Sequence, residues 1–292
     1  MSQGESGDAG PGPGAPKRRT PGNLQLRVAS ALVLAAVVLA LTYLGGAAFR
    51  VLVAAVIVAV FAEWTVMARP RADRTTRWLA APLFALVVVV LLFGAGPALA
   101  FGVLAAAVVV SLVYALVRRR DYWMVTALAY AGVPGLALVY LRGADAPGLV
   151  AVLLLFAVVW ATDTLAYFSG RGLGGPKLAP RVSPSKTWSG AVGGALGGMA
   201  AGLAVALIAG SGVGLPAIAV LALGLSVVAQ FGDLFESAVK RRHGVKDSSH
   251  LIPGHGGMMD RVDGLLASAV ALYVVGALLS GPQTPAHGFF AP

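Results

Sequence analysis

The chain has 292 residues, of which 58% are hydrophobic and only 12% are charged, and its formal net charge is +10. A soluble domain carries about 25% charged residues, so this composition excludes a soluble globular protein and predicts an all-α, polytopic integral membrane protein. The chain has no cysteine, which excludes disulfides and thiolate catalysis. We interpret the positive charge as orienting the helices and meeting anionic lipid, and we expect no nucleic-acid partner.

Residues 1–23 are rich in Gly and Pro and are expected to form a disordered cytosolic tail. Nine apolar stretches follow, each long enough to cross about 30 Å of hydrocarbon. We divide the chain into N-terminal membrane helices over 24–145, a catalytic membrane region over 146–281 and a short non-cytosolic tail over 282–292. The expected spans are 26–45, 48–67, 78–95, 97–117, 123–141, 149–169, 190–210, 215–236 and 262–280.

The 22 Lys and Arg residues test this division. If the N-terminal tail is cytosolic, nine spans place 20 of these residues on the cytosolic side and only Arg50 and Arg142 on the other. Cytosolic loops of membrane proteins are enriched in Lys and Arg. The pattern therefore predicts a cytosolic N-terminus and a C-terminus on the opposite side.

Two cytosolic loops, 170–189 and 240–261, contain Gly, Pro and Ser as well as cations, the second also contains His and Asp, and function is expected there. Acids within or at the ends of spans are also candidates, because a carboxylate in the bilayer is costly and usually functional. Asp163 is expected to face a polar cavity, with a structural hydrogen bond as the alternative. For Glu63, a site role and a side chain that merely reaches the membrane surface both remain open.

The acids on two later spans form a pattern suited to a metal ion. In QFGDLFESAVKRR, Asp233, Glu236 or Ser237, and Lys240 are spaced so that they fall on one helix face. Asp260 and Asp263 are three residues apart at the start of the last span, so they also share a face. Together with Asp163 they fit a hard divalent cation such as Mg²⁺, which prefers carboxylate and phosphate oxygens.

The loop GGPKLAPRVSPSKTWSG combines cations, hydroxyls and flexible backbone, which is phosphate-binding chemistry. It lacks the spacing of a Walker loop. An acid cluster beside a phosphate-binding loop at the cytosolic face predicts Mg²⁺-dependent phosphoryl or nucleotidyl transfer to a lipid. The candidate phosphate-binding residues are Lys177, Arg181, Ser183, Ser185, Lys186 and Thr187.

The stretch SAVKRRHGVKDSSHLIPGHGGMMDRVD, residues 237–263, resembles the signature of phosphatidate cytidylyltransferases, also called CDP-diacylglycerol synthases. TDTLAYFSGRGLGG (162–175) and SPSKTWSG (183–190) are similar to two further blocks of that family. The resemblance covers about 150–280 and implies a polytopic enzyme of phospholipid biosynthesis in the bacterial cytoplasmic membrane. Its substrates would be CTP and phosphatidate, its products CDP-diacylglycerol and pyrophosphate, and its site would face the cytosol and use Mg²⁺.

The resemblance also implies roles for single residues. Asp233 and Asp260 are expected to bind the metal, with Asp263 and Asp163 next, and a second metal or a monovalent cation is left open. Ser183, Ser185 and Lys186 would bind substrate phosphate or metal. His255 has two readings, a donor to phosphate or a satisfied loop histidine. The residues expected to hold the phosphates of CTP or the leaving pyrophosphate are Lys240, Lys246 and Arg261.

Several alternatives stay open at this point. A related CTP-dependent enzyme could act on another lipid, of the polyprenol or archaeol type. A CDP-alcohol phosphotransferase matches the sequence less well, because DRVDG copies only fragments of that motif. An ion or lipid transporter would also place acids in the membrane. The small-residue stretch GGALGGMAAG predicts close helix packing, either within one chain or between the subunits of a homodimer.

Overall fold

The computed structural model describes residues 23–67, 74–249, 251 and 256–290. Within these residues the protein is almost entirely helical, and eight helices are long and apolar enough to cross a membrane. This confirms the predicted all-α, polytopic class. The first predicted span corresponds to a further long helix, α1, whose Ser30–Leu44 part is a shorter apolar segment. The predicted tail lies outside the described residues except for Asn23, at which α1 begins.

The elements follow the predicted order, with an added hairpin and a short terminal helix. The helices are α1 (Asn23–Leu44), α2 (Gly46–Met67), α3 (Arg74–Leu92), α4 (Pro97–Val117), α5 (Trp123–Arg142), α6 (Ala146–Leu173), α7 (Trp188–Ala209), α8 (Leu215–Arg242), α9 (Met259–Ser280) and α10 (His287–Phe290). The strands are β1 (Lys177–Ala179) and β2 (Ser183–Thr187).

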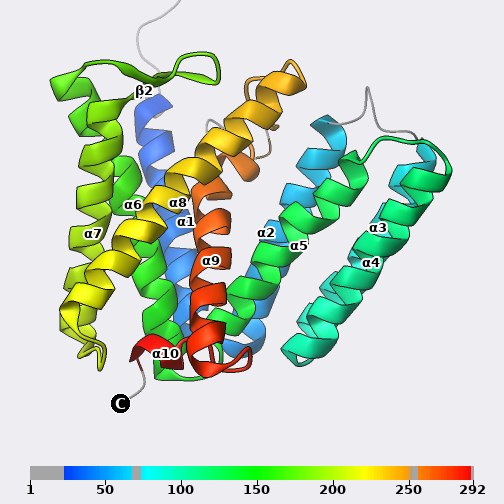
Figure 1. The fold of residues 1–292 in the computed structure, drawn as a ribbon, viewed down its shortest axis with the longest axis horizontal. Coiled ribbons are helices and arrows are strands. Elements are labelled where there is room, and N and C mark those ends of the chain that lie inside the picture. The colour runs from blue at the N-terminus through cyan, green and yellow to red at the C-terminus, as the bar shows by residue number, and fades with distance from the viewer. Residues whose placement is uncertain (1–22, 68–73, 250, 252–255, 291–292) are drawn as a thin grey trace, which may run out of the picture.

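The helices form a bundle in which α9 lies between two groups (Figure 1). On one side α6, α7 and α8 pack against one another, and α8 also packs along α9. On the other side α5 contacts α9 and connects it to α2, α3 and α4. The hairpin, the C-terminal end of α8 and the start of α9 lie at the same end of the bundle, whereas α10 lies at the opposite end.

The two loops predicted to carry function are more ordered than the sequence suggested. Helix α6 continues to Leu173, and the rest of the first loop forms the antiparallel hairpin β1–β2, with Lys177 opposite Thr187. Helix α8 continues to Arg242, and α9 begins at Met259. Parts of both predicted loops therefore belong to helix ends or to the hairpin, and residues 250 and 252–255 of the second loop lie outside the described residues.

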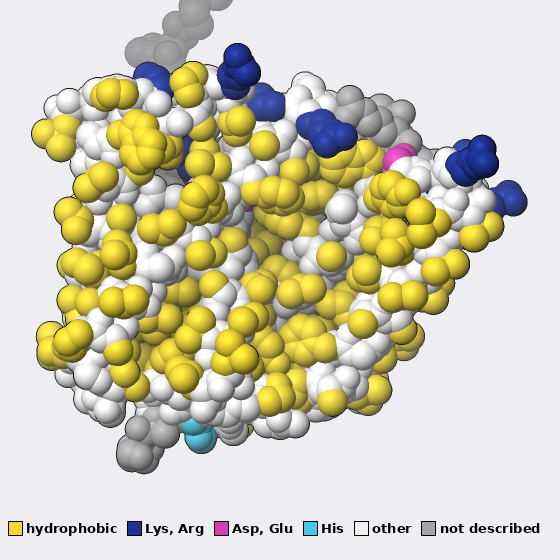
Figure 2. Space-filling model, viewed as in Figure 1, with side chains coloured by type: hydrophobic (Ala, Val, Ile, Leu, Met, Phe, Trp, Pro, Cys, Tyr) yellow, Lys and Arg dark blue, Asp and Glu magenta, His cyan; other side chains and the backbone are white. Residues whose placement is uncertain are grey.

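The surface separates by chemistry. Lys and Arg side chains gather along the edge at which the hairpin and the end of α8 lie, and hydrophobic side chains cover the face below it (Figure 2). Large apolar residues such as Ile208 and Leu278 are more than four-fifths exposed, which suits contact with lipid and not with water. This distribution agrees with the predicted gathering of cations on one side of the membrane.

The two Arg residues predicted on the other side serve helix ends. Arg142 is buried and donates from Nε to the Thr42 carbonyl at 2.6 Å and from Nη2 to the Tyr43 carbonyl at 3.0 Å, at the C-terminal end of α1. Arg50 donates to the carbonyl of Leu92, at the end of α3. Cations at helix C-termini satisfy carbonyls that have no partner within the helix. This capping role explains why Arg50 and Arg142 lie at the end of the bundle away from the other cations.

At the same end, Asp145 caps α6 by accepting from the Gly148 N–H at 3.0 Å, and it pairs with His287 of α10 at 2.6 Å. Partial burial acts to raise the pKa of Asp145, but the hydrogen bonds with His287 and Gly148 outweigh it and bring the pKa below its ordinary value. The pair ties the C-terminal segment to the start of α6.

Glycines set how closely the central helices approach. A Cβ on Gly198 of α7 would lie 2.4 Å from Thr162 Oγ1 of α6, and the stretch predicted to pack closely does so within the chain. A Cβ on Gly232 of α8 would lie 2.8 Å from the carbonyl oxygen of Asp263. The missing side chain therefore lets α8 and α9 cross almost backbone to backbone beside Asp233 and Asp263.

We predict that Gly232→Ala lowers the stability of the folded protein by about 1–3 kcal/mol, the usual cost of overpacking. The added methyl would meet Ala267 Cβ and the Asp263 carbonyl oxygen, both at 2.8 Å. Gly224→Ala on the same helix is the matched control, because a Cβ there meets nothing within 4 Å. Thermal unfolding in detergent measures both variants. Equal melting temperatures would show that the close crossing is not required.

Candidate active site

Three carboxylates converge where α8 crosses α9. Asp233 and Glu236 come from α8 and Asp263 from α9, and one oxygen of each lies within 4.8 Å of the others. Spacing of three residues places the two α8 acids on neighbouring turns, and the Gly232 crossing brings the α9 acid against them. We call Asp233, Glu236 and Asp263 the acid cluster.

Two lysines face these acids. Lys186, from β2, forms an ion pair with Asp233. Lys240 is almost fully buried and contacts both Glu236 and, at 2.6 Å, Asp260. Four carboxylates thus face two ammonium groups, which leaves two negative charges that these lysines do not balance. Charge of this kind inside a protein is costly unless a cation or a proton neutralises it.

One atom of the acid cluster fits a metal directly. Glu236 is 1% exposed, and its Oε1 is buried with no hydrogen-bond partner among the described residues. Buried polar atoms nearly always have a partner, and a carboxylate oxygen that lacks one is suited to bind a cation. The donor set is all oxygen, which is the chemistry that Mg²⁺ prefers. The residues present therefore fit a hard divalent cation.

Asp260 lies beside the acid cluster but has different partners. Its oxygens accept from Lys240 Nζ, from the Ser248 N–H at 3.0 Å, and from the Gly257 N–H at 2.8 Å. The Ser248 hydroxyl lies 2.9 Å away. Gly256 has φ +82°, a conformation that favours glycine and turns the chain toward this carboxylate. In this structure Asp260 joins the two ends of the loop between α8 and α9.

Glu63, from α2, holds the same loop from the other side. It is 4% exposed and accepts from the Met258 and Met259 N–H groups, both at 2.7 Å, at the start of α9. Ser249 Oγ lies 2.6 Å from its Oε1, and Ser248 Oγ lies 3.0 Å from its Oε2. The Ser248 hydroxyl is thus within hydrogen-bond distance of both Glu63 and Asp260.

Sequence reasoning left Glu63 and Glu236 out of the predicted site residues. For Glu63 the signal was an acid in an apolar span, and the structure resolves the two readings in favour of a buried residue that contacts the site loop. For Glu236 the signal was its spacing from Asp233 and Lys240. Tyr130 on α5 carried no signal. Its hydroxyl is buried, has no hydrogen-bond partner in the described part of the chain, and lies close enough to the acids for Asp263 and Glu236 to act on it electrostatically.

The hairpin places the predicted phosphate-binding residues at the rim. Thr187 is buried, and its hydroxyl accepts from the Gly190 N–H at 3.1 Å and caps α7. Lys186, next to it, points to Asp233. Four predicted residues are not brought into the cluster by any described contact and lie exposed or half-buried on the hairpin: Lys177, Arg181, Ser183 and Ser185.

The remaining predicted residues lie around the cluster. Asp163 is exposed on α6, and both Asp233 and Lys186 are near enough to act on it electrostatically. Lys246 and Arg261 are exposed at the same end of the bundle. His255 lies outside the described residues, so its predicted role stays a prediction.

Comparison with known proteins gives a consistent result. A family model described as "Cytidylyltransferase family" matches residues 25–279. A phosphatidate cytidylyltransferase of Brucella suis is 46% identical over 271 residues, which are 92% of this chain and 99% of that protein. Proteins of the same name from Bacillus subtilis and Thermotoga maritima are 36% and 34% identical over 48% and 44% of this chain, and over 52% and 50% of their own lengths.

Proposed function

Because the chain belongs to the cytidylyltransferase family, we propose that it transfers the cytidylyl group of CTP to phosphatidate and forms CDP-diacylglycerol and pyrophosphate. The observation that carries this proposal is the acid cluster beside Lys186, at the basic end of a bundle of membrane helices. A triphosphate from the aqueous side and a phosphate at the bilayer surface would meet there. CDP-diacylglycerol formation makes the protein an enzyme of phospholipid biosynthesis.

In the proposed reaction, an oxygen of the phosphatidate phosphate attacks the α-phosphorus of CTP in line. One P–O bond forms, and the bond to the leaving pyrophosphate breaks. A phosphate monoester is already anionic and nucleophilic, so no covalent enzyme intermediate is required. The protein contributes positioning and charge neutralisation, which dominate phosphoryl transfer.

We assign the cationic residues to the phosphates. Lys186 is placed to exchange its contact with Asp233 for a substrate phosphate, since it is held beside the acid cluster by the fixed end of β2. Lys177 and Arg181 on the exposed part of the hairpin, with Lys246 and Arg261 at the same end, would guide the triphosphate to it. Lys240 is buried between two acids, where it fixes their geometry.

Asp233, Glu236 and Asp263 would hold Mg²⁺, with Asp163 as a further ligand through its position near Asp233. When bound, Mg²⁺ would supply neutralisation of the polyphosphate charge. We assign Asp260 to the loop, because its oxygens accept from Lys240 and from two backbone N–H groups. The sequence predicted instead that Asp260 binds the metal. A comparison of Asp260→Asn with Asp263→Asn distinguishes these two roles.

We further propose that the basic end of the bundle faces the cytosol. The proposal is supported by the 20-to-2 distribution of Lys and Arg in the sequence and by the gathering of these residues along one edge. The two exceptions, Arg50 and Arg142, cap helix ends. CTP is made in the cytosol, so this orientation brings the site to its substrate.

The test is pyrophosphate release by purified protein supplied with CTP, phosphatidate and Mg²⁺, each omitted in turn. We expect release only when all three are present. In sealed vesicles, only molecules whose basic end faces outward should use external CTP. Pyrophosphate release with a polyprenyl or archaeol-type lipid, and not with phosphatidate, would show that the protein acts on another lipid. Transport of lipid or ions without CTP would contradict the enzyme.

A further inference from the structure

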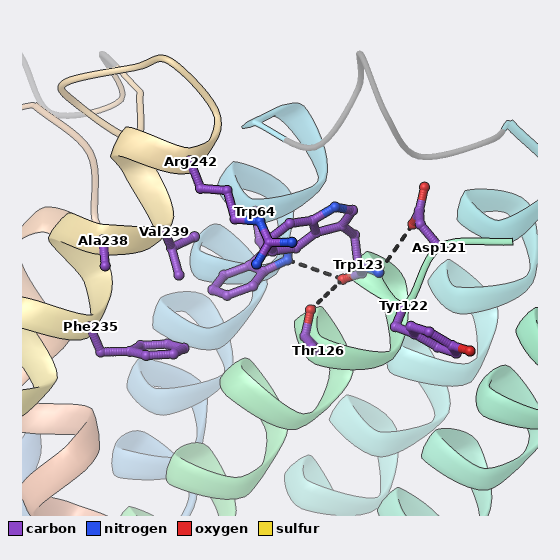
Figure 3. A pocket seen from close by; sticks show the side chains of 9 residues that line it. All are labelled: Trp64, Asp121, Tyr122, Trp123, Thr126, Phe235, Ala238, Val239 and Arg242. Carbon is purple, nitrogen blue, oxygen red and sulfur yellow. Dashed lines mark hydrogen bonds between the residues drawn. The ribbon is translucent and has the colours of Figure 1, made fainter.

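A groove of about 470 Å³ opens between α2, α5 and α8, near the basic edge of the molecule. Its walls are mainly aromatic and aliphatic, and Figure 3 shows Trp64, Trp123, Phe235 and Val239 around it. The volume falls in the usual range of small-molecule sites, about 300–1,000 Å³. The mechanism above does not use this groove.

The groove is polar at one end and apolar at the other. Arg242 lies at the top in Figure 3, with its guanidinium carbon 5.4 Å from the centre of the Trp123 ring, and Phe235 lies below it on the same helix. Trp64 Nε1 donates to the backbone carbonyl of Trp123 at 3.1 Å, which orients the Trp64 indole. Asp121 also lines the groove, and its carboxylate accepts from the Trp123 N–H at 3.1 Å at the start of α5.

The groove and the acid cluster lie on opposite faces of α8. Residues 235, 238, 239 and 242 line the groove, and their spacing defines one helix face. Asp233 and Lys240 belong to the other face. Arg242 is also displaced from Asp233 by about 13 Å along the axis at 1.5 Å per residue. A phosphate held at Arg242 would therefore lie on the opposite side of α8 from the acid cluster.

We propose that this groove binds an anionic phospholipid that is not the reacting lipid. Its phosphodiester would contact Arg242, and one acyl chain would run along Phe235, Val239 and Trp64 toward the membrane interior. Trp at this level is typical of the membrane interface, and basic pockets between membrane helices bind anionic headgroups.

A bound lipid would act on the site through α8. Val239 directly precedes Lys240 and Arg242 lies two residues after it, and Lys240 contacts Glu236 and Asp260. His243 follows directly, with its ring 4.2 Å from that of Trp123. An occupant that packs against this last turn of α8 would hold Lys240 in register with the two acids.

The test uses the two indoles in the groove as reporters. The other three Trp residues are replaced (Trp78→Phe, Trp160→Phe and Trp188→Phe), and fluorescence is quenched with phospholipids that carry brominated acyl chains. We expect brominated phosphatidylglycerol to bind about tenfold more tightly than brominated phosphatidylcholine. Both lipids carry a phosphodiester, but the choline ammonium of phosphatidylcholine would lie beside Arg242 and oppose the contact. Arg242→Gln should remove this preference. Arg119→Gln, on the exposed loop outside the groove, should keep it.

Melting temperatures of both Arg variants verify that they are folded. Equal quenching by the two lipids would overturn the proposal, as would a preference that survives in Arg242→Gln. Quenching by brominated phosphatidate without quenching by phosphatidylglycerol would also overturn it, because the groove would then belong to the reacting lipid. The readout is binding, so its failure is distinct from a failure of the proposed reaction.

Discussion

Glu63→Gln is expected to lower turnover by about 10–100-fold, the usual effect of losing a partner that orients a site. The substitution keeps the size of the side chain, but Gln has one acceptor oxygen where the carboxylate of Glu63 offers two to the loop. The Met258 and Met259 N–H groups each donate to a different oxygen of Glu63. The Gln amide group would face one of these donors, and a buried N–H without an acceptor costs about 1–3 kcal/mol.

Steady-state pyrophosphate release measures the loss of turnover, and hydrogen exchange at Met258 and Met259 measures the loosened start of α9. The exchange signal separates a positioning role from general destabilisation, since amides in the middle of α9 should stay protected. Asp247→Asn is the matched control: it is an exposed acid of the same loop and should leave turnover and exchange unchanged. Normal turnover together with normal protection in Glu63→Gln would refute the positioning role.

Asp263→Asn and Asp260→Asn are expected to fail in different ways. Asp263 belongs to the acid cluster that would hold Mg²⁺, so Asp263→Asn should reduce turnover by about 10²-fold or more, as the loss of several kcal/mol of charge stabilisation implies. Residual activity should need a higher Mg²⁺ concentration. Asp260→Asn should chiefly lower the melting temperature, because the contacts with Ser248, Gly257 and Lys240 weaken.

The measurement is a Mg²⁺ titration of turnover for both variants beside their thermal unfolding. A shifted Mg²⁺ midpoint in Asp260→Asn, with unchanged stability, would make Asp260 a metal ligand and contradict our assignment. An unshifted midpoint in an active Asp263→Asn would remove the acid cluster as the metal site. Glu236→Gln provides a second variant of the cluster on α8, should Asp263→Asn not fold.

Much of the fold followed from local signals. Long apolar stretches and the positions of Lys and Arg predicted the helices to within a few residues, because the bilayer sets their length. The ends of α6, α8 and α9 were less predictable, since Leu173, Arg242 and Met259 lie outside the hydrocarbon signal and depend on tertiary contacts. The hairpin at Lys177–Thr187 was read as a loop, because its Pro and Gly content is typical of loops.

The site was predicted only as far as residues close in sequence allowed. Asp233 and Asp263 were both candidates, but their convergence depends on the backbone crossing at Gly232, which no periodicity shows. The division of labour between Asp263 and Asp260 depends on which backbone N–H groups are nearby. Glu63 lies in a region without any matched motif, and its partners Met258 and Met259 are about two-thirds of the chain away.

That separation has a consequence for how the protein is made. During synthesis α2 enters the membrane before the serines and the start of α9 exist, so Glu63 has none of these four partners while the intervening helices are inserted. A carboxylate without partners at this depth is costly, and contacts so distant in the chain form late. Helix α9 therefore completes the reaction centre and also supplies the partners that stabilise Glu63 on α2. A chain that stops after α8 would leave Glu63 of α2 without these partners.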